Sequence, residues 1–329
     1  MSAGRQWWVV PGPDGGRVEL RSMERPEPAA GQVVVQVRAA GVNRGELIGM
    51  PLVREGTPGG VARPSGIEFA GEVAALGEGV GGWSVGQRVM GRGSACHADW
   101  TTVAARALMA VPDQLDDPSA AAIPNVFVTA HDALTSAGGL AAGETVLITA
   151  GSSGVGTAAI QLARMLGAGT VLVTSRSLAK AGRLRELGAD GVVDTTVDGW
   201  PRQVRELTDG RGIDLVIDQV GGALFPGLMK AMALHGRFVG VGRNDGAAST
   251  IDLDLLARNQ LRLIGVTFRT RTAEEALAAS EAFVAQCGSA VADGRLQPVL
   301  DRTFPLDDLP AAHRYLASDA QIGKVVLVA

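Results

Sequence analysis

The sequence predicts an α/β protein in which a doubly wound parallel sheet interrupts a β-rich domain. Two changes of pattern along the chain carry this prediction. Up to residue 122 the chain shows short strands between Gly- and Pro-rich turns, and from there to residue 269 apolar strands alternate with helices. Beyond residue 269 a long helix is followed by strand patterns again. We therefore expect residues 1–122 and 270–329 to form one split domain around an inserted domain at 123–269.

The first part of the chain has the pattern of a compact, barrel-like antiparallel domain. Short strands are predicted at 32–39, 70–75 and 88–90, and only short helical pieces fit between them. Residues 1–10 are predicted to form a strand that contains tryptophan. They lack the apolar core of a secretion signal, so no export is expected.

The inserted domain is predicted from short and almost wholly apolar runs, as strands covered on both faces require. Helices with short loops separate them, which is the order that a parallel sheet with crossover helices produces. The predicted strands are 145–150, 170–174, 191–193, 213–218, 236–241 and 261–268. The predicted helices are 157–166, 178–187, 200–208 and 224–233. In the tail we expect helices at 273–291 and 307–318 and returning strand segments at 296–305 and 324–328.

Composition excludes several classes of protein. Of the 329 residues, 46% are hydrophobic and 19% are charged, which excludes a disordered chain or a coiled coil. The net charge is −4 and no long basic run is present, so no nucleic-acid partner is expected. No uncharged apolar stretch approaches the ~20 residues of a membrane span. Two cysteines cannot build a disulfide framework, and a cytoplasmic location is the expectation.

A glycine-rich turn follows the first strand of the inserted domain. Its residues are Gly151, Ser152, Ser153, Gly154, Val155 and Gly156. A helix that begins at such a turn offers free N–H groups and a partial positive charge, and glycine lets a pyrophosphate approach the backbone closely. Because the turn lies between an apolar strand and a helix, we predict that it binds a dinucleotide. The alternative is an ordinary tight turn between strand and helix.

The end of the second strand of this domain indicates which dinucleotide binds. A carboxylate about 20 residues after the turn is typical of NAD(H), because it accepts a hydrogen bond from the ribose 2′-hydroxyl. This sequence has Ser175 and Arg176 there, with Lys180 one turn later. Hydroxyl and cationic groups suit a 2′-phosphate, so the pattern predicts NADPH. The alternative is that both cations are solvated surface charges.

Six short segments carry a resemblance to a known family. They lie at 41–44 (GVNR), 66–71 (GIEFAG), 86–89 (GQRV), 150–156 (AGSSGVG), 187–190 (LGAD) and 323–327 (GKVVL). Through them the chain resembles the zinc-independent quinone oxidoreductases, the zeta-crystallin-like group of the medium-chain dehydrogenase/reductase superfamily, over essentially its whole length. The resemblance implies a GroES-like catalytic domain around an inserted Rossmann domain.

The same resemblance implies that no zinc is bound. Zinc-dependent members hold the metal through a cysteine, a histidine and a second cysteine. The first two positions correspond here to Asn43 and Ile67, and the third ligand region, near Asn125, contains no cysteine. Thiolate, imidazole or carboxylate ligands are needed to hold Zn²⁺. We therefore expect no metal, and an acceptor that takes hydride without a Lewis acid.

The resemblance also places residues at the nicotinamide and along the cofactor. It implies that Asn43 and Thr129 lie at the nicotinamide end and that Lys324 reaches the cofactor phosphates or ribose. The alternatives are that Asn43 stabilises a turn and that Lys324 is a surface lysine. Residues that follow strand ends of the sheet are also expected to contact the cofactor, because ligands bind at the carboxyl ends of such strands. These are Gly221, Val241, Gly242, Arg243, Phe268 and Arg269.

The function expected from these features is NADPH-dependent hydride transfer to a quinone or a similar conjugated carbonyl, with Asn43 polarising the acceptor. No histidine is favoured as the acid, nor is the single tyrosine, Tyr315, so solvent is expected to protonate the product. One alternative is reduction of an enone or a 2-enoyl thioester by the same chemistry. Another is a non-catalytic NADPH-binding redox sensor. Because relatives often pair their sixth Rossmann strands, and 261–266 is apolar, we also expect a homodimer.

Overall fold

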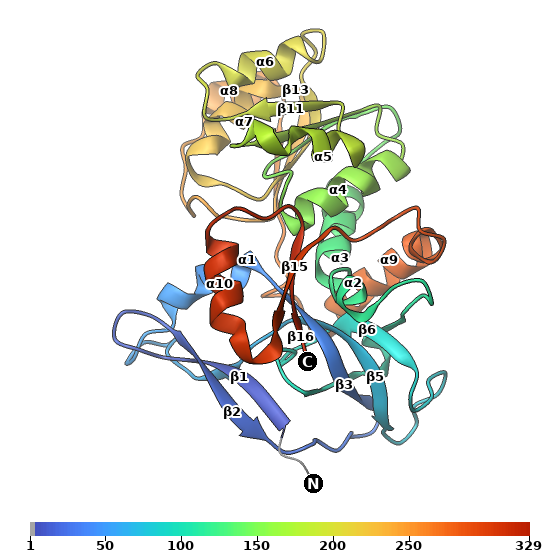
Figure 1. Cartoon of the computed structure of the whole chain (residues 1–329). Helices are drawn as coiled ribbons and strands as arrows, with labels where there is room; N and C mark the ends of the chain where they lie inside the picture. Colours follow the sequence, from blue (N-terminus) through green and yellow to red (C-terminus); the bar gives the residue numbers. More distant parts are fainter. Residues whose placement is uncertain (1–3) are drawn as a thin grey trace. The chain divides into compact units, whose positions relative to one another are not determined.

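The computed structural model describes residues 4–329, which fold into two compact units (Figure 1). One unit comprises the chain up to Val126 together with Ser280–Ala329, and the other comprises Phe127–Ala279. The predicted α/β class, with a parallel sheet inserted into a split β-rich domain, is confirmed. Both divisions fall inside helices, so no loop marks them in the sequence. The first follows Val126 and the second follows Ala279, where the expected domains end at 122 and 269.

The first unit is built on a seven-stranded sheet and a three-stranded sheet. The larger sheet has the order β15-β16-β3-β5-β6-β8, with β7 also paired to β3, and the smaller has the order β2-β1-β4. The strands are β1 (Gly4–Val10), β2 (Arg17–Met23), β3 (Gln32–Val42), β4 (Arg63–Pro64), β5 (Glu68–Leu76), β6 (Arg88–Arg92), β7 (Trp100–Ala104), β8 (Leu108–Ala110), β15 (Leu300–Pro305) and β16 (Lys324–Val328). The first three residues of the predicted strand 1–10 lie outside the described part.

The tail of the chain completes this sheet. Strand β16, red in Figure 1, runs antiparallel to β3, blue, with Val325 opposite Val42. Both strands are apolar and buried, as inner strands of a sheet covered on both sides require. Around β3 the core includes Val35, Phe69 and Val89, all fully buried. The returning strand β16 is therefore part of the hydrophobic core of the first unit.

Short helices connect these strands, and two further helices span the divisions between the units. The helices of the first unit are α1 (Arg44–Gly49), α2 (Asp117–Ala121) and α10 (Leu309–Ala317). Helix α10 buries Leu309, Ala312 and Leu316 in a cluster with Val325 of β16. The two helices at the divisions are α3 (Pro124–Asp132) and α9 (Ala273–Ala292).

The second unit is a six-stranded parallel sheet with the order β11-β10-β9-β12-β13-β14. Its strands are β9 (Thr145–Ile148), β10 (Thr170–Ser175), β11 (Gly191–Asp194), β12 (Ile213–Asp218), β13 (Met232–Gly240) and β14 (Arg262–Gly265). Its helices are α4 (Gly154–Met165), α5 (Ala181–Glu186), α6 (Trp200–Glu206), α7 (Phe225–Ala231) and α8 (Leu253–Arg258). The direction in which strands are added reverses between β9 and β12. A crevice at the carboxyl ends of the strands beside such a reversal is where doubly wound sheets bind ligands.

Three elements of this sheet differ from the prediction. Strand β14 is shorter than the predicted strand 261–268, because it pairs on one side only, with β13. The predicted helix 224–233 ends at Ala231, and Met232 is already extended opposite Ile213. The predicted helix 178–187 is a 3₁₀ turn followed by the short helix α5, which contains Gly182 and so has weak helix propensity. Within residues 4–329, no helix is long and apolar enough to cross a membrane.

A buried histidine ties together three segments of the first unit. The His97 Nδ1 atom lies 3.0 Å from the Ser65 hydroxyl, and Nε2 lies 3.1 Å from the Gly41 carbonyl oxygen. Its backbone bonds to Trp7 and Ser65. Because Gly41 O can only accept, the neutral ring carries its proton on Nε2 and accepts from Ser65 at Nδ1. Burial lowers the pKa of this ring from its ordinary value of 6.5, so the fold selects the neutral form.

This histidine predicts a loss of stability in mild acid. The unfolded chain binds a proton at His97 more readily than the folded chain, so the free energy of unfolding falls as the pH drops from about 6.5 towards the lower folded-state pKa. Denaturant unfolding measured between pH 8 and pH 5 tests this. His97→Gln should be less stable at pH 8 by ~1–3 kcal/mol, because it loses buried hydrogen bonds, but should show a flatter pH dependence. His235→Asn, at an exposed histidine, is the control and should keep the wild-type slope.

Candidate functional site

The glycine-rich turn lies between β9 and α4, as predicted. Ser153 is the N-cap of α4, and its hydroxyl accepts a hydrogen bond of 3.0 Å from the Gly156 N–H. A Cβ on Gly156 would lie 2.5 Å from the Ala150 carbonyl oxygen, and one on Gly151 would lie 2.8 Å from the Val173 side chain. The turn is thus packed too closely for side chains at these glycines, and the twelve-residue helix behind it directs its N-terminus at the crevice.

A buried network that the sequence analysis missed supports this turn. The Thr149 hydroxyl donates to Asp218 over 2.7 Å, and the N–H groups of Val220 and Gly221 donate to the same carboxylate. The next side chain, Gln219, donates to the Thr149 carbonyl oxygen and accepts a hydrogen bond of 2.8 Å from Ser153. Burial raises the pKa of Asp218. The sequence does contain a signal for this network, namely Asp218, a carboxylate at the end of the apolar strand β12.

Several predicted cofactor residues also lie at the carboxyl ends of this sheet. The loop after β12 contains Gly221, which has a φ of +67°. The backbone N–H groups of Val241 and Gly242, after β13, donate to the Asp218 carbonyl oxygen, and Arg243 follows them. The structure therefore brings the glycine-rich turn and these two loops to one edge of the sheet.

The other cofactor residues follow the outer strands. Ser175 ends β10, and its hydroxyl donates to the Ser177 carbonyl oxygen over 2.9 Å, which closes the loop that carries Arg176 and Lys180. Phe268 and Arg269 come after β14. The guanidinium of Arg271 lies 4.3 Å from the Phe268 ring centroid, so this aromatic side chain has a cationic neighbour.

In the first unit, Asn43 and Lys324 meet in a buried polar cluster with Glu68 and Asn125. The Lys324 ammonium donates to Glu68 Oε1 over 2.6 Å, to Asn43 Oδ1 over 2.8 Å and to the Val42 carbonyl oxygen over 3.0 Å. Asn43 Nδ2 donates to Glu68 Oε1 over 2.9 Å. Asn125 donates its backbone N–H to Glu68 Oε2 and its side-chain N–H to Asn43 Oδ1. Neither Glu68 nor Asn125 was predicted as a site residue, although Glu68 lies in the segment 66–71 that carries the resemblance and Asn125 lies in the expected third ligand region.

A second carboxylate borders this cluster. The Glu46 carboxylate lies 3.4 Å from Asn43 Nδ2, 3.9 Å from His97 Nε2 and 3.7 Å from His313 Nε2. Its Oε2 atom and His313 Nε2 are both buried and lack a hydrogen-bond partner. Burial opposes ionisation of Glu46, but nearby positive charge, including that of Lys324, outweighs it and lowers the pKa of this carboxyl. Glu46 therefore stays negatively charged beside the cluster.

The residues present do not fit a zinc ion. Asn43 and Asn125, at or near ligand positions of zinc-dependent relatives, are amides that bond to one another, and Ile67 has no ligand atom. The Lys324 ammonium already neutralises Glu68, so a dication there would meet a fixed positive charge. Among residues 4–329, no three His, Cys, Asp or Glu side chains are grouped to hold a metal ion.

Two further residues considered in the sequence analysis, Thr129 and Tyr315, are not part of the cluster around Lys324. Thr129 is on α3 and buried, with 8% of its surface exposed. Asn43 and Thr129 belong to different units, so their shared place at a nicotinamide stays a prediction. The Tyr315 hydroxyl donates to Asp301 over 2.7 Å, which raises the pKa of this phenol. The phenol of Tyr315 is thus bonded to another side chain of the protein.

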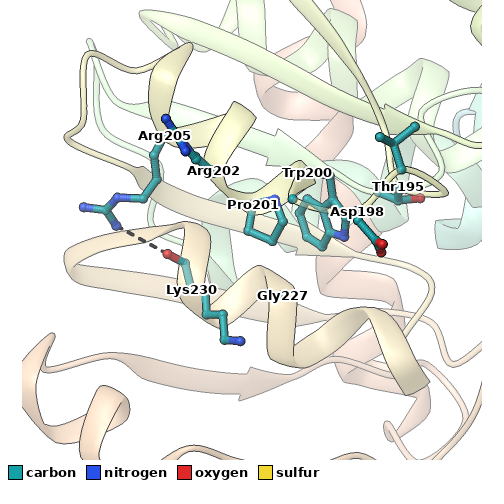
Figure 2. A pocket seen from close by; sticks show the side chains of 10 residues that line it. Thr195, Asp198, Trp200, Pro201, Arg202, Arg205, Gly227 and Lys230 are labelled. Carbon is teal, nitrogen blue, oxygen red and sulfur yellow. Dashed lines mark hydrogen bonds between the residues drawn. The ribbon is translucent and has the colours of Figure 1, made fainter.

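A cavity of about 550 Å³ lies on the second unit between α6 and α7, away from the predicted residues (Figure 2). Trp200 and Gly227 both line it and pack closely, since a Cβ on Gly227 would collide with the indole ring. Arg205 spans one side, with its guanidinium donating to the Lys230 carbonyl oxygen over 3.4 Å. None of the residues predicted to bind the cofactor lines this cavity.

The packing at the turn predicts a binding defect. Gly156→Ala places a methyl group against two backbone carbonyl oxygens, so the turn must move and the N–H groups that face a phosphate move with it. We expect the Kd for NADPH, measured by fluorescence titration, to rise on the order of tenfold or more. Gly182→Ala, on α5 with open space around its Cβ, is the matched control and should bind as the wild type does. Equal affinities for both variants would contradict the role of the turn.

Two family models match the chain. The alcohol dehydrogenase GroES-like domain matches residues 29–115, and the zinc-binding dehydrogenase model matches residues 187–327. Among curated proteins, a spectinabilin polyketide synthase protein of Streptomyces orinoci is 35% identical over 98% of this chain. A phenolphthiocerol/phthiocerol polyketide synthase protein of Mycobacterium tuberculosis is 32% identical over 94%. The chain spans 14% of the length of each of these two relatives.

Solved structures match the whole chain. A mycobacterial protein complexed with NADPH has 27% identity and a TM-score of 0.87 over 100% of both chains. A mycobacterial quinone oxidoreductase has 29% identity and a TM-score of 0.81 over 100% of both chains. The JamJ enoyl reductase has 27% identity and a TM-score of 0.86 over 99% of both chains. With its two family domains and these neighbours, the chain belongs to the medium-chain dehydrogenase/reductase superfamily, in the zinc-independent quinone oxidoreductase-like group.

Proposed function

We propose that this chain is an NADPH-dependent reductase that transfers hydride to a conjugated carbonyl compound, with a quinone as the acceptor. The observation that carries the proposal is the cluster around Lys324, in which an ammonium group, a carboxylate and two amides satisfy one another by hydrogen bonds. Such a cluster supplies hydrogen bonds and fixed charge, but no Lewis acid. The acceptor must therefore be electron-poor by itself, as quinones and enones are.

The second unit supplies the features that an NADPH site needs. When bound, this cofactor supplies the hydride. The turn from Gly151 to Gly156 would hold the pyrophosphate at the N-terminus of α4. Ser175, Arg176 and Lys180, after β10, would hold the 2′-phosphate, and no carboxylate there competes for a ribose hydroxyl. The NADPH complex of the mycobacterial neighbour supports this proposal.

Asn43 is the side chain through which the first unit would act on the acceptor. It is half-buried, and only one of its two Nδ2 hydrogens has a short partner, Glu68. The second hydrogen can polarise a carbonyl oxygen as charge develops on it. In quinone reduction the acceptor gains a hydride from the cofactor and a proton from solvent, which yields the hydroquinone and the oxidised cofactor. No side-chain acid is required, because the hydroquinone anion is well stabilised.

The 2′-phosphate assignment predicts a change of cofactor preference. Arg176→Asp should raise the Kd for NADPH on the order of 10- to 100-fold, because it replaces an attraction to the phosphate with a repulsion. The Kd for NADH should change little. Arg183→Asp is the matched control, since Arg183 is an exposed arginine on the following helix that pairs with Glu186. An equal loss of affinity for both dinucleotides in Arg176→Asp would refute the assignment.

A second candidate function is reduction of a 2-enoyl thioester or an enone. The two polyketide synthase relatives and the JamJ enoyl reductase favour it, because all three align over nearly the whole chain. A quinone and a 2-enoyl thioester or enone accept hydride for the same reason, since each carries a C=C bond conjugated to a carbonyl group. What differs is the size and polarity of the group beyond that carbonyl. A non-catalytic NADPH-binding sensor is the third alternative.

Substrate comparison separates these functions. With NADPH in excess, we expect kcat/KM for a benzoquinone or naphthoquinone to exceed that for a 2-enoyl thioester of N-acetylcysteamine by at least about tenfold. The reverse order would establish the enoyl reductase function. NADPH binding without oxidation by any acceptor would support the sensor. Addition of a zinc chelator should leave the turnover unchanged, and a loss of turnover would contradict the metal-free mechanism.

A homodimer also remains part of the proposal. Strand β14 is the last strand of the parallel sheet, and it is only partly covered, with Leu263 37% exposed. An apolar edge strand of this kind is suited to pairing with a second copy about a two-fold axis.

A further inference from the structure

We propose that Lys324 is a positioning residue that locks the side-chain amide of Asn43 in one orientation, so that Asn43 can only donate hydrogen bonds to a ligand. The inference deepens the proposed function and rests on it in one respect, namely that the acceptor or the cofactor meets Asn43. It replaces the expectation from the family resemblance that Lys324 itself contacts the cofactor.

The three N–H groups of the Lys324 ammonium all have partners within the protein. They donate to Glu68 Oε1, Asn43 Oδ1 and the Val42 carbonyl oxygen, at 2.6, 2.8 and 3.0 Å. A lysine has three donors and no acceptor, so none remains for a phosphate or a ribose. The side chain is also buried, with 3% of the residue exposed. Lys324 can therefore affect a ligand only through its neighbours.

The oxygen of the Asn43 amide is fully used as well. Oδ1 accepts from Lys324 at 2.8 Å and from Asn125 Nδ2 at 2.9 Å, which occupies both lone pairs. If the amide were flipped, its NH₂ group would face an ammonium and another NH₂ group, and two donors would oppose it. The cation and the Asn125 amide together therefore fix which end of Asn43 is nitrogen.

The nitrogen end has one donor that is only weakly bound within the protein. Nδ2 donates one hydrogen to Glu68 Oε1 at 2.9 Å, and the other has only long contacts of 3.4 Å, to the Gly41 carbonyl oxygen and Glu46 Oε1. Glu68 is fully buried, and its second oxygen accepts from the Asn125 backbone N–H, so it cannot rotate freely. The group that Asn43 presents is thus an N–H whose direction is set by a buried ion pair.

A double-mutant cycle tests this coupling. Asn43→Ala and Lys324→Met should each lower kcat with the best acceptor on the order of 10- to 100-fold, the range for loss of one polarising donor. If Lys324 acts through Asn43, the double variant should be no slower than the slower single variant. Once the Asn43 amide is absent, loss of Lys324 has no amide orientation to change. The Kd for NADPH should stay within about twofold of the wild type in Lys324→Met.

Two outcomes would overturn the proposal. Multiplied losses of kcat in the double variant would show that the two side chains act independently. A large rise in the Kd for NADPH in Lys324→Met, with kcat unchanged at saturation, would show that Lys324 contacts the cofactor directly.

Lys324→Met leaves a buried carboxylate without its cation and can fail to fold, so a second variant is needed. The pair Glu68→Gln with Lys324→Met removes both charges. Its glutamine can both donate and accept, so either orientation of Asn43 becomes possible. We expect this variant to fold, to bind NADPH and to show the same loss of kcat as Asn43→Ala. Wild-type kcat in this folded variant would overturn the proposal.

A measurement without turnover separates this inference from the proposed function. The side-chain NH₂ signals of Asn43, assigned by their loss in Asn43→Ala, should appear as one well-separated pair in the ¹⁵N–¹H spectrum of the wild type. In the Glu68→Gln, Lys324→Met variant they should shift and broaden. Unchanged signals would overturn the lock. If the wild type reduces no acceptor, the proposed function fails, and these spectra still decide whether Lys324 orients Asn43.

Discussion

The buried ion pair between Lys324 and Glu68 is the interaction on which the architecture of the first unit depends. Lys324 is the first residue of β16, and Glu68 is the first residue of β5. Two charges with almost no exposure to solvent are stable only together, and removal of one partner costs about 3–5 kcal/mol. The pair therefore fixes the last strand of the chain against segments from its beginning, and β16 lies inside the sheet between β15 and β3.

The same constraint explains why Asn43 is an asparagine in this chain. Asn43 follows β3, at the point where β3 lies beside β16, and its oxygen completes the coordination of the ammonium. Its Nδ2 atom donates a hydrogen bond to the Glu68 carboxylate. A side chain with an acceptor and a donor on one planar group satisfies both charges at once, whereas aspartate would repel Glu68 and leucine would leave Lys324 short of one acceptor. The structural role of Asn43 and the role proposed for it toward a ligand would thus have a common origin.

The sequence predicted local features of this protein well and long-range contacts poorly. The bounds of β12 and β16 are those predicted, since an apolar run between polar residues marks a buried strand at both ends. The glycine-rich turn was recognisable because its strand, turn and helix are contiguous. In contrast, Lys324 lies 256 residues from Glu68 and 281 from Asn43, and no periodicity connects positions so far apart. The support of the turn by Asp218 and Gln219 was missed for the same reason, as they lie 69 and 66 residues from Thr149 and Ser153.

An ammonium whose donors are all bound within the protein limits what the site can accomplish. A metal ion with an open coordination position can bind a substrate oxygen directly and withdraw electron density from it. The Lys324 ammonium has no open position of this kind, because its three hydrogens are bound to protein oxygens. A single amide N–H polarises a carbonyl far less than a metal does. If Asn43 meets the acceptor, as proposed, a site of this kind suits acceptors whose conjugation already lowers the barrier to hydride addition.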